Sequence, residues 1–162
     1  MTVQYDVKSY HATTSGNATT YAVRLKGLTV TTGTVSARNM AIADPSVNKT
    51  GTWSRTGTTV TVTINGNGLT NGQRVFLDVA AGTTMRDGVY EVSNVTTNTF
   101  TVTSATSGVA SGTVTMYTNI YVEVDTYNTI GLSMPVPGEG VYCPNGIYVG
   151  LGSSVTATVL YG

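Results

Sequence analysis

The chain has 162 residues, enough for one domain or for two small ones. Its 32 Thr and 23 Val are β-branched, whereas Glu, Lys and Leu, which favour helices, are scarce, so the composition favours strands. Eight basic residues balance eight acidic ones, and this zero net charge gives no electrostatic reason to bind nucleic acid or an anionic membrane.

The first 47 residues alternate apolar and polar side chains in several short segments, as half-buried strands do. We expect a turn-rich stretch from His11 to Asn17, a break at Gly27, and the end of the last strand at Asp44-Pro45. The predicted strands are residues 3–7, 21–25, 28–30 and 35–42.

A second unit is expected over residues 48–118. Its apolar alternation recurs every 10 to 14 residues, with turn residues such as Asn65-Gly66-Asn67-Gly68 between the repeats. This spacing suits a small five-stranded β-barrel-like unit. The predicted strands are residues 59–64, 75–79, 89–95, 100–102 and 114–116.

The last segment, residues 119–162, is also strand-like. Further strands are expected at residues 120–125, 147–151 and 155–161, where apolar residues again alternate. Prolines and glycines between residues 131 and 140 make that stretch unsuitable for a central strand. No stretch shows a capped 3.6-residue apolar stripe, so we expect almost no helix.

Few residues could carry chemistry. Cys143 is the only cysteine, so an internal disulfide is excluded, and we interpret it as a small semi-buried hydrophobe. His11 is the only histidine and is expected in an exposed loop, where nothing indicates that it meets Cys143. Glu123 and Asp125 could imitate a glycosidase pair, but we interpret them as the water-facing side of an edge strand. We therefore expect no catalytic residue, no metal site and no cofactor.

Targeting signals are not visible in the sequence. The first 20 residues lack the basic and apolar regions of a signal peptide, and no apolar run reaches the roughly 18 residues of a membrane span. These features predict a soluble product made in the cytosol.

Aromatic residues are the remaining candidates for a binding surface. Tyr is favoured at protein interfaces and can also fill a core with one end wet. Six tyrosines lie in strand patterns and are interpreted as structural: Tyr5, Tyr10, Tyr21, Tyr90, Tyr121 and Tyr148. Four aromatics lie near the ends of predicted elements or near the last residue and are the candidates for a contact surface: Trp53, Tyr117, Tyr142 and Tyr161.

Two groups of short motifs carry a resemblance. The middle unit contains Asn67-Gly68-Leu69, Gly72, Val75-Phe76-Leu77-Asp78, Asp87-Gly88-Val89-Tyr90-Glu91-Val92, Asn98-Thr99-Phe100-Thr101-Val102 and Ser111-Gly112-Thr113-Val114. The flanks contain Arg24-Leu25-Lys26-Gly27-Leu28, Pro137-Gly138-Glu139-Gly140-Val141, Asn145-Gly146-Ile147-Tyr148-Val149 and Val159-Leu160-Tyr161-Gly162. Both groups, mainly turn glycines and alternating hydrophobes, resemble structural proteins of tailed bacteriophages, especially marine ones.

This resemblance implies an all-β protein in which residues 1–47 and 119–162 form one jelly-roll-like β-sandwich. Residues 48–118 would be an inserted barrel-like unit, which a surface loop accommodates at little cost. The implied function is a non-enzymatic virion component, assembled in the host cytoplasm. We expect a capsid decoration or cement protein that binds the major capsid protein, associates as a homotrimer, and binds neither nucleic acid nor membrane.

Two alternatives stay open. One is a tail, fibre or baseplate component that contacts host surface polysaccharide. The other is a small depolymerase, which the missing acid and base groups disfavour. Copy number in the virion would separate a head protein from a tail protein.

Overall fold

The computed structural model of the chain describes residues 6–33, 38–80, 85–126 and 131–162. These residues form thirteen β-strands and no helix, and all the strand pairings are antiparallel. The predicted all-β class is confirmed.

Two sheets are built from the flanks of the chain. Sheet A has the order β1-β13-β3-β10, with β11 also paired to β3. Its strands are β1 (Lys8–Ala12), β3 (Val23–Thr32), β10 (Leu132–Pro135), β11 (Val141–Cys143) and β13 (Val155–Tyr161). Sheet B has the order β2-β12-β4-β9. Its strands are β2 (Gly16–Thr19), β4 (Arg38–Ala43), β9 (Ile120–Thr126) and β12 (Ile147–Leu151).

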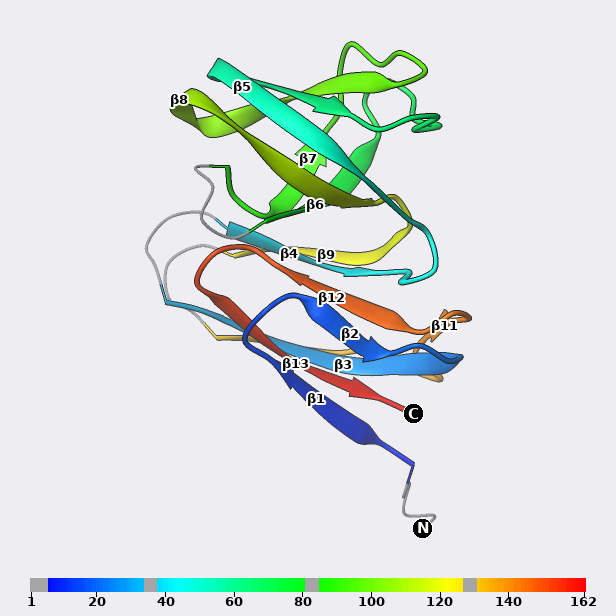
Figure 1. Cartoon of the computed structure of the whole chain (residues 1–162). Helices are drawn as coiled ribbons and strands as arrows, with labels where there is room; N and C mark the ends of the chain where they lie inside the picture. The colour runs from blue at the N-terminus through cyan, green and yellow to red at the C-terminus, as the bar shows by residue number, and fades with distance from the viewer. Residues whose placement is uncertain (1–5, 34–37, 81–84, 127–130) are drawn as a thin grey trace.

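Sheet C is built from the middle of the chain, in the order β5-β8-β6-β7. Its strands are β5 (Asn48–Thr63), β6 (Arg74–Val79), β7 (Gly88–Glu91) and β8 (Thr99–Tyr117). The chain leaves sheet B after β4 and returns to it at β9, and these two strands are neighbours in sheet B. Figure 1 shows the three sheets as layers, with sheet B in the middle and the first and last strands, β1 and β13, on the side of sheet A.

The middle position of sheet B explains the sequences of its central strands. Along β12, Ile147, Val149 and Leu151 face sheet A, whereas Tyr148 faces sheet C. Strand β4 divides its residues in the same way, with Ala41 among those facing sheet C. Because successive side chains point to opposite faces, a strand between two layers is apolar at nearly every position.

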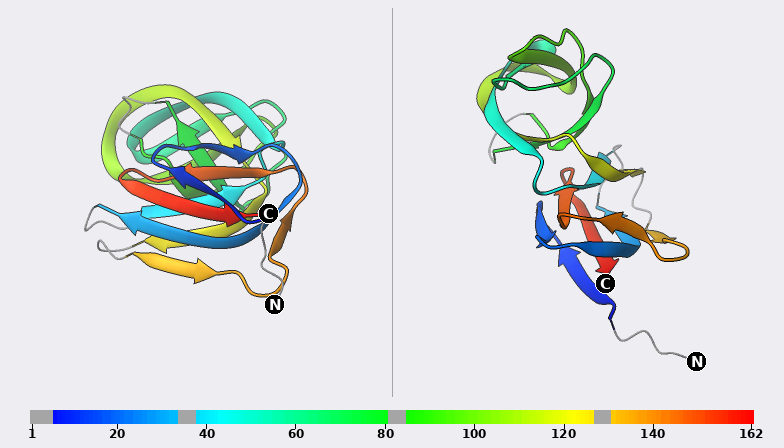
Figure 2. Two further views of the ribbon diagram at one scale, coloured as in Figure 1. Left: turned by 90° about the horizontal axis from the view of Figure 1, so that it is seen from below. Right: turned by 90° about the vertical axis from the view of Figure 1, so that its right-hand side faces the viewer.

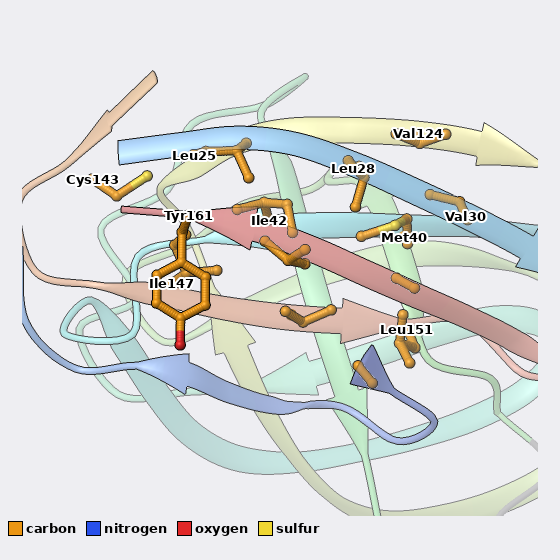
Figure 3. Close-up of a cluster of buried hydrophobic side chains, with 14 of the residues drawn as sticks. Leu25, Leu28, Val30, Met40, Ile42, Val124, Cys143, Ile147, Leu151 and Tyr161 are labelled. Carbon is orange, nitrogen blue, oxygen red and sulfur yellow. The ribbon is translucent and has the colours of Figure 1, made fainter. Parts of the chain in front are cut away.

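Each interface has its own apolar cluster. Figure 3 shows the cluster between sheets A and B, in which Leu25, Met40, Ile42 and Leu151 are fully or almost fully buried. A second cluster fills the inside of sheet C, around Trp53 and other buried side chains. A third, smaller cluster joins sheets B and C.

The structure corrects the predicted barrel over residues 48–118. Four strands are found instead of five, and no closed barrel is found among the residues that the structure describes. The predicted strands at 100–102 and 114–116 are parts of one strand, β8, which pairs with β5 along almost its whole length. Gly57 and Gly108 face each other at a register shift, both with positive φ, and mark the irregularity in this long pair. Figure 2 shows how strongly this part of the chain curls.

Two predictions near the N-terminus are also corrected. The first predicted strand falls mostly on residues 3–5, which lie outside the described residues. The predicted turn-rich stretch from His11 to Asn17 is shorter than expected, because β1 (Lys8–Ala12) extends over its first two residues and β2 (Gly16–Thr19) over its last two. Gly27 does not break the chain but lies inside the continuous strand β3, next to a register shift opposite Leu160 and Tyr161. A β-bulge thus accommodates a residue that resembled a strand end.

Candidate functional site

Three of the four predicted contact residues are interior. Trp53 is 2% exposed, and Tyr117 and Tyr161 are each 8% exposed. Trp53 faces the inside of sheet C, Tyr117 packs between sheets B and C, and Tyr161 packs between sheets A and B. Their positions near predicted element ends therefore did not make them accessible. Only Tyr142 is exposed, at 57%.

Tyr142 lies at one end of sheet A beside a cation. Strand β11 places it opposite Arg24 of β3, and the guanidinium carbon lies 5.5 Å from the centroid of the Tyr142 ring. Arg24 is held by Glu139 at 3.6 Å and donates to the carbonyl oxygen of Gly140 at 3.4 Å. Tyr142 is thus presented to solvent by a fixed cation–π contact.

A second exposed tyrosine forms a similar pair close by. Lys8 donates to the hydroxyl of Tyr21 at 3.3 Å, and its ammonium lies 5.7 Å from the ring centroid. The hydrogen bond from Lys8 is the largest cause that lowers the pKa of Tyr21. Tyr21 is 54% exposed because β3 begins only at Val23, so the predicted structural role of Tyr21 is wrong.

The strand order brings the two pairs to the same end of sheet A. Lys8 pairs with Tyr161, Tyr161 with Leu25, and the neighbouring Arg24 with Tyr142. Lys8 shares the inner face of sheet A with Tyr161 and Leu25, whereas Arg24 and Tyr142 lie on its outer face, so the two pairs flank this end of the sheet from opposite sides. We call Lys8, Tyr21, Arg24 and Tyr142 the end patch. Tyr and Arg are the residue types enriched at the centres of protein interfaces.

Sheet C is locked to sheet B by three aromatic rings. Tyr117 and Tyr148 stack with centroids 3.8 Å apart at 15°, and Phe76 packs against both at 6.5 and 6.2 Å. Gly150 leaves room for Phe76, because a Cβ there would lie 2.6 Å from the ring. Burial is the main cause that raises the pKa values of Tyr117 and Tyr148, and Tyr148 also donates a hydrogen bond to Asp78.

Polar contacts reinforce the same junction. The side-chain amide of Asn39 on β4 donates to the carbonyl oxygen of Val89 at 3.2 Å and accepts from its N–H at 2.9 Å. Arg74 on β6 forms a bidentate ion pair with Glu123 on β9. Glu123 lies on an edge strand, as predicted. Its side chain, however, contacts the neighbouring sheet instead of facing only water. Such fork geometry fixes relative position.

Asp44 organises the two crossings between sheets B and C. It is 2% exposed, accepts from the amide and hydroxyl of Ser46 at 2.9 and 2.7 Å, and accepts from Asn145 at 2.9 Å and Asn119 at 3.3 Å. Burial disfavours the charge, but the hydrogen bonds from Asn145 and Ser46 outweigh it and lower the pKa of Asp44 to about 2. The carboxylate thus joins residues that precede and follow sheet C.

A cleft of about 730 Å³ lies between sheets B and C, beside the contact between Asn39 and Val89. Its walls contain two arginines, three carboxylates and a tyrosine: Arg38, Arg86, Asp87, Glu91, Asp125 and Tyr90. Burial raises the pKa of Asp87 to about 6 and that of Tyr90 to about 12, so Tyr90 remains a neutral phenol. Neither alternation nor spacing predicted this cleft, since its residues come from four strands and two connections.

The residues considered for catalysis are separated. His11 lies on strand β1 rather than in a loop, is exposed, and shares a hydrogen bond with Thr158 at 2.9 Å. Cys143 is fully buried between sheets A and B, on the opposite face of sheet A, and burial raises the pKa of its thiol to about 11. Within the described residues, no cluster of three or more His, Cys, Asp or Glu side chains could hold a metal ion.

Comparison with known proteins adds no assignment. No protein family, no curated protein and no solved structure matches this chain. In the ranges that the structure describes, no helix is long and apolar enough to cross a membrane.

Proposed function

We propose that the chain is a non-enzymatic structural protein of a tailed-phage virion, which decorates the head and binds the major capsid protein. Sheets A and B form the anchoring sandwich in this proposal, and sheet C is the part displayed to the outside. The homotrimer and the location on the virion belong to the same proposal.

The end patch is the observation that carries this proposal. It presents two tyrosines, each held by a cation, at one end of the sheet farthest from sheet C (Figure 1): Tyr142 on the outer face of sheet A, and Tyr21 beside Lys8 on the inner side. Side chains that are ordered before binding lose little conformational entropy on association, which favours affinity. Sheet B also supports the proposal, because sheets A and C already cover its two faces. Among the described residues of the two anchoring sheets, only those of sheet A therefore have a face open to a partner.

The layered architecture supports durability outside a cell. The aromatic junction, the Asn39 clamp and the Arg74–Glu123 pair all hold sheet C against sheet B without a disulfide. A displayed unit fixed at several points transmits force to its anchor instead of swinging on a linker.

The test uses the full chain and particles assembled without it. Wild-type chain should sediment with these particles in hundreds of copies each, and the double variant Arg24→Ala with Tyr142→Ala should bind at least tenfold more weakly. Val109→Ala is the matched control, since Val109 is 87% exposed but lies on sheet C. Equal binding of the double variant and the wild type would remove the end patch from the proposal. Absence of binding by the wild-type chain would remove the head location.

A further inference from the structure

The cleft between sheets B and C has walls from both parts of the fold. Arg38 of β4 and Asp125 of β9 contribute from sheet B, whereas Arg86, Tyr90 of β7 and Ser104 of β8 contribute from sheet C. Its volume of about 730 Å³ falls within the roughly 300–1,000 Å³ of small-molecule sites. The junction contacts described above fix the two walls relative to each other.

Charged groups of both signs line this cleft without meeting. Among the described residues, Arg86, Glu91 and Asp125 form no ion pair within 4 Å, although all three line the same space. The three side chains therefore keep hydrogen-bonding capacity for a ligand. The pKa of Arg74 is raised mainly by the hydrogen bond to its carboxylate partner, and the charges of Asp125 and Glu91 raise it further. Arg38 lies near Arg86: burial and then the positive charge of Arg86 lower the pKa of Arg38.

This arrangement selects the class of ligand. An anion would meet three carboxylates, and a cation would meet two guanidinium groups. A neutral hydroxyl group can bind to both kinds of charged side chain, because it accepts a hydrogen bond from a guanidinium and donates one to a carboxylate. A ligand with several such hydroxyls on a rigid ring can bridge the cleft at more than one point.

The cleft is also partly preorganised. The hydroxyl of Tyr90 donates to the carbonyl oxygen of Arg86 at 2.6 Å, which orients the ring and the backbone of Arg86 together. Arg38 is held from two sides: its Nε donates to the carbonyl oxygen of Ser153 at 3.2 Å, and its own carbonyl oxygen accepts from Thr126 at 3.1 Å. The half-buried Tyr90 ring supplies an apolar face of the kind that packs on sugar C–H groups.

We propose that this cleft binds a neutral oligosaccharide, with Arg86 and Asp125 contacting its hydroxyl groups from opposite walls. This goes beyond a role in capsid decoration and holds whether or not the chain is a head protein. A virion component with such a cleft would attach weakly and repeatedly to neutral surface glycans.

The test is a titration of the full chain, labelled with ¹⁵N, with neutral oligosaccharides of glucose, galactose and N-acetylglucosamine. Sulfated and uronic-acid oligosaccharides of equal length serve as acidic comparisons. At least one neutral series should shift the backbone amide signals of Arg86, Tyr90 and Asp125 in a saturable manner. Arg86→Gln and Asp125→Asn should each weaken binding about tenfold, since each loses a charge-assisted hydrogen bond.

Matched controls remove one charge of each sign elsewhere. The controls are Lys49→Gln, at a residue on sheet C, and Asp6→Asn, at a residue that precedes sheet A. The affinity of both variants for the oligosaccharide should lie within about twofold of the wild-type value. The midpoint of thermal unfolding shows that each variant is folded.

Three results would overturn the proposal: no cleft signals shift with any neutral series, acidic oligosaccharides bind tenfold more tightly, or both cleft variants bind like the wild type. Binding of the cleft variants to particles is measured separately. Loss of glycan binding with retained particle binding would leave the decoration proposal standing.

Discussion

Phe76 of sheet C packs over Gly150 of sheet B, and Gly150→Ala tests whether that contact holds the layers together. A methyl group at Gly150 would lie 2.6 Å from two carbons of the Phe76 ring and 2.8 Å from a third. Ordinary carbon contacts are about 3.5 Å or longer, so the ring must move by about 1 Å. Phe76 is fully buried and packs against Tyr117 and Tyr148, which leaves it no free direction.

The expected cost follows from this clash. Overpacking of a well-filled core typically costs about 1–3 kcal/mol, and the absence of free space places Gly150→Ala near 2–3 kcal/mol. For a chain of this length, that corresponds to a fall of roughly 5–10 °C in the unfolding midpoint. Phe76→Leu removes part of the ring and should cost about 1–2 kcal/mol on its own.

The decisive assay is a double-mutant cycle by urea unfolding. If the ring causes the clash, Gly150→Ala in the Phe76→Leu background should cost less than about 1 kcal/mol, a coupling of at least about 1 kcal/mol. Gly33→Ala is the control, because a Cβ there finds its nearest neighbour at 3.9 Å, and it should change stability by less than about 0.5 kcal/mol. Additive costs within about 0.5 kcal/mol would refute the reasoning.

Three further predictions concern titratable groups. The lowered pKa of Asp44 stabilises the fold by about 2 kcal/mol above pH 4, and this contribution should disappear as the pH falls from about 4 to 2. In a plot of unfolding free energy against pH, Asp44→Asn should flatten that part of the curve. The raised pKa of Asp87 has the opposite effect, so the free energy of unfolding should fall as the pH rises from about 4 through 6. In urea unfolding, Asp87→Asn should be about 1–3 kcal/mol more stable than the wild type at pH 7 and equally stable at pH 3.5. Cys143 is fully buried with a raised pKa, so a thiol reagent at pH 7.5 should modify it only in denaturant, and rapid native labelling followed by mass spectrometry would contradict its placement.

Strands whose apolar alternation reaches a core were predictable from the sequence. The segments around Val75, Val122 and Val159 became β6, β9 and β13 within a few residues of the predicted bounds. Strand β5 was only half predicted, because residues 48–58 are mostly polar and only Trp53 and Arg55 among them are buried. A strand that buries so few side chains leaves almost no periodic signal.

The candidate site was much less predictable, for a physical reason. Tyr117 is the last residue of β8 and Tyr142 is the middle residue of the short strand β11, yet Tyr117 is buried between layers and Tyr142 is exposed. What separates them is the stacking of sheet C on sheet B, which no local pattern encodes. The end patch likewise depends on pairings between residues more than a hundred positions apart, such as Arg24 with Tyr142.

Electron microscopy of the purified particle, with the copies of this chain located and counted, tests the central proposal most directly. We expect hundreds of symmetrically placed copies on the head, with the end patch against the major capsid protein and sheet C pointing outward. A few copies on the tail, or head copies with sheet C against the shell, would contradict it.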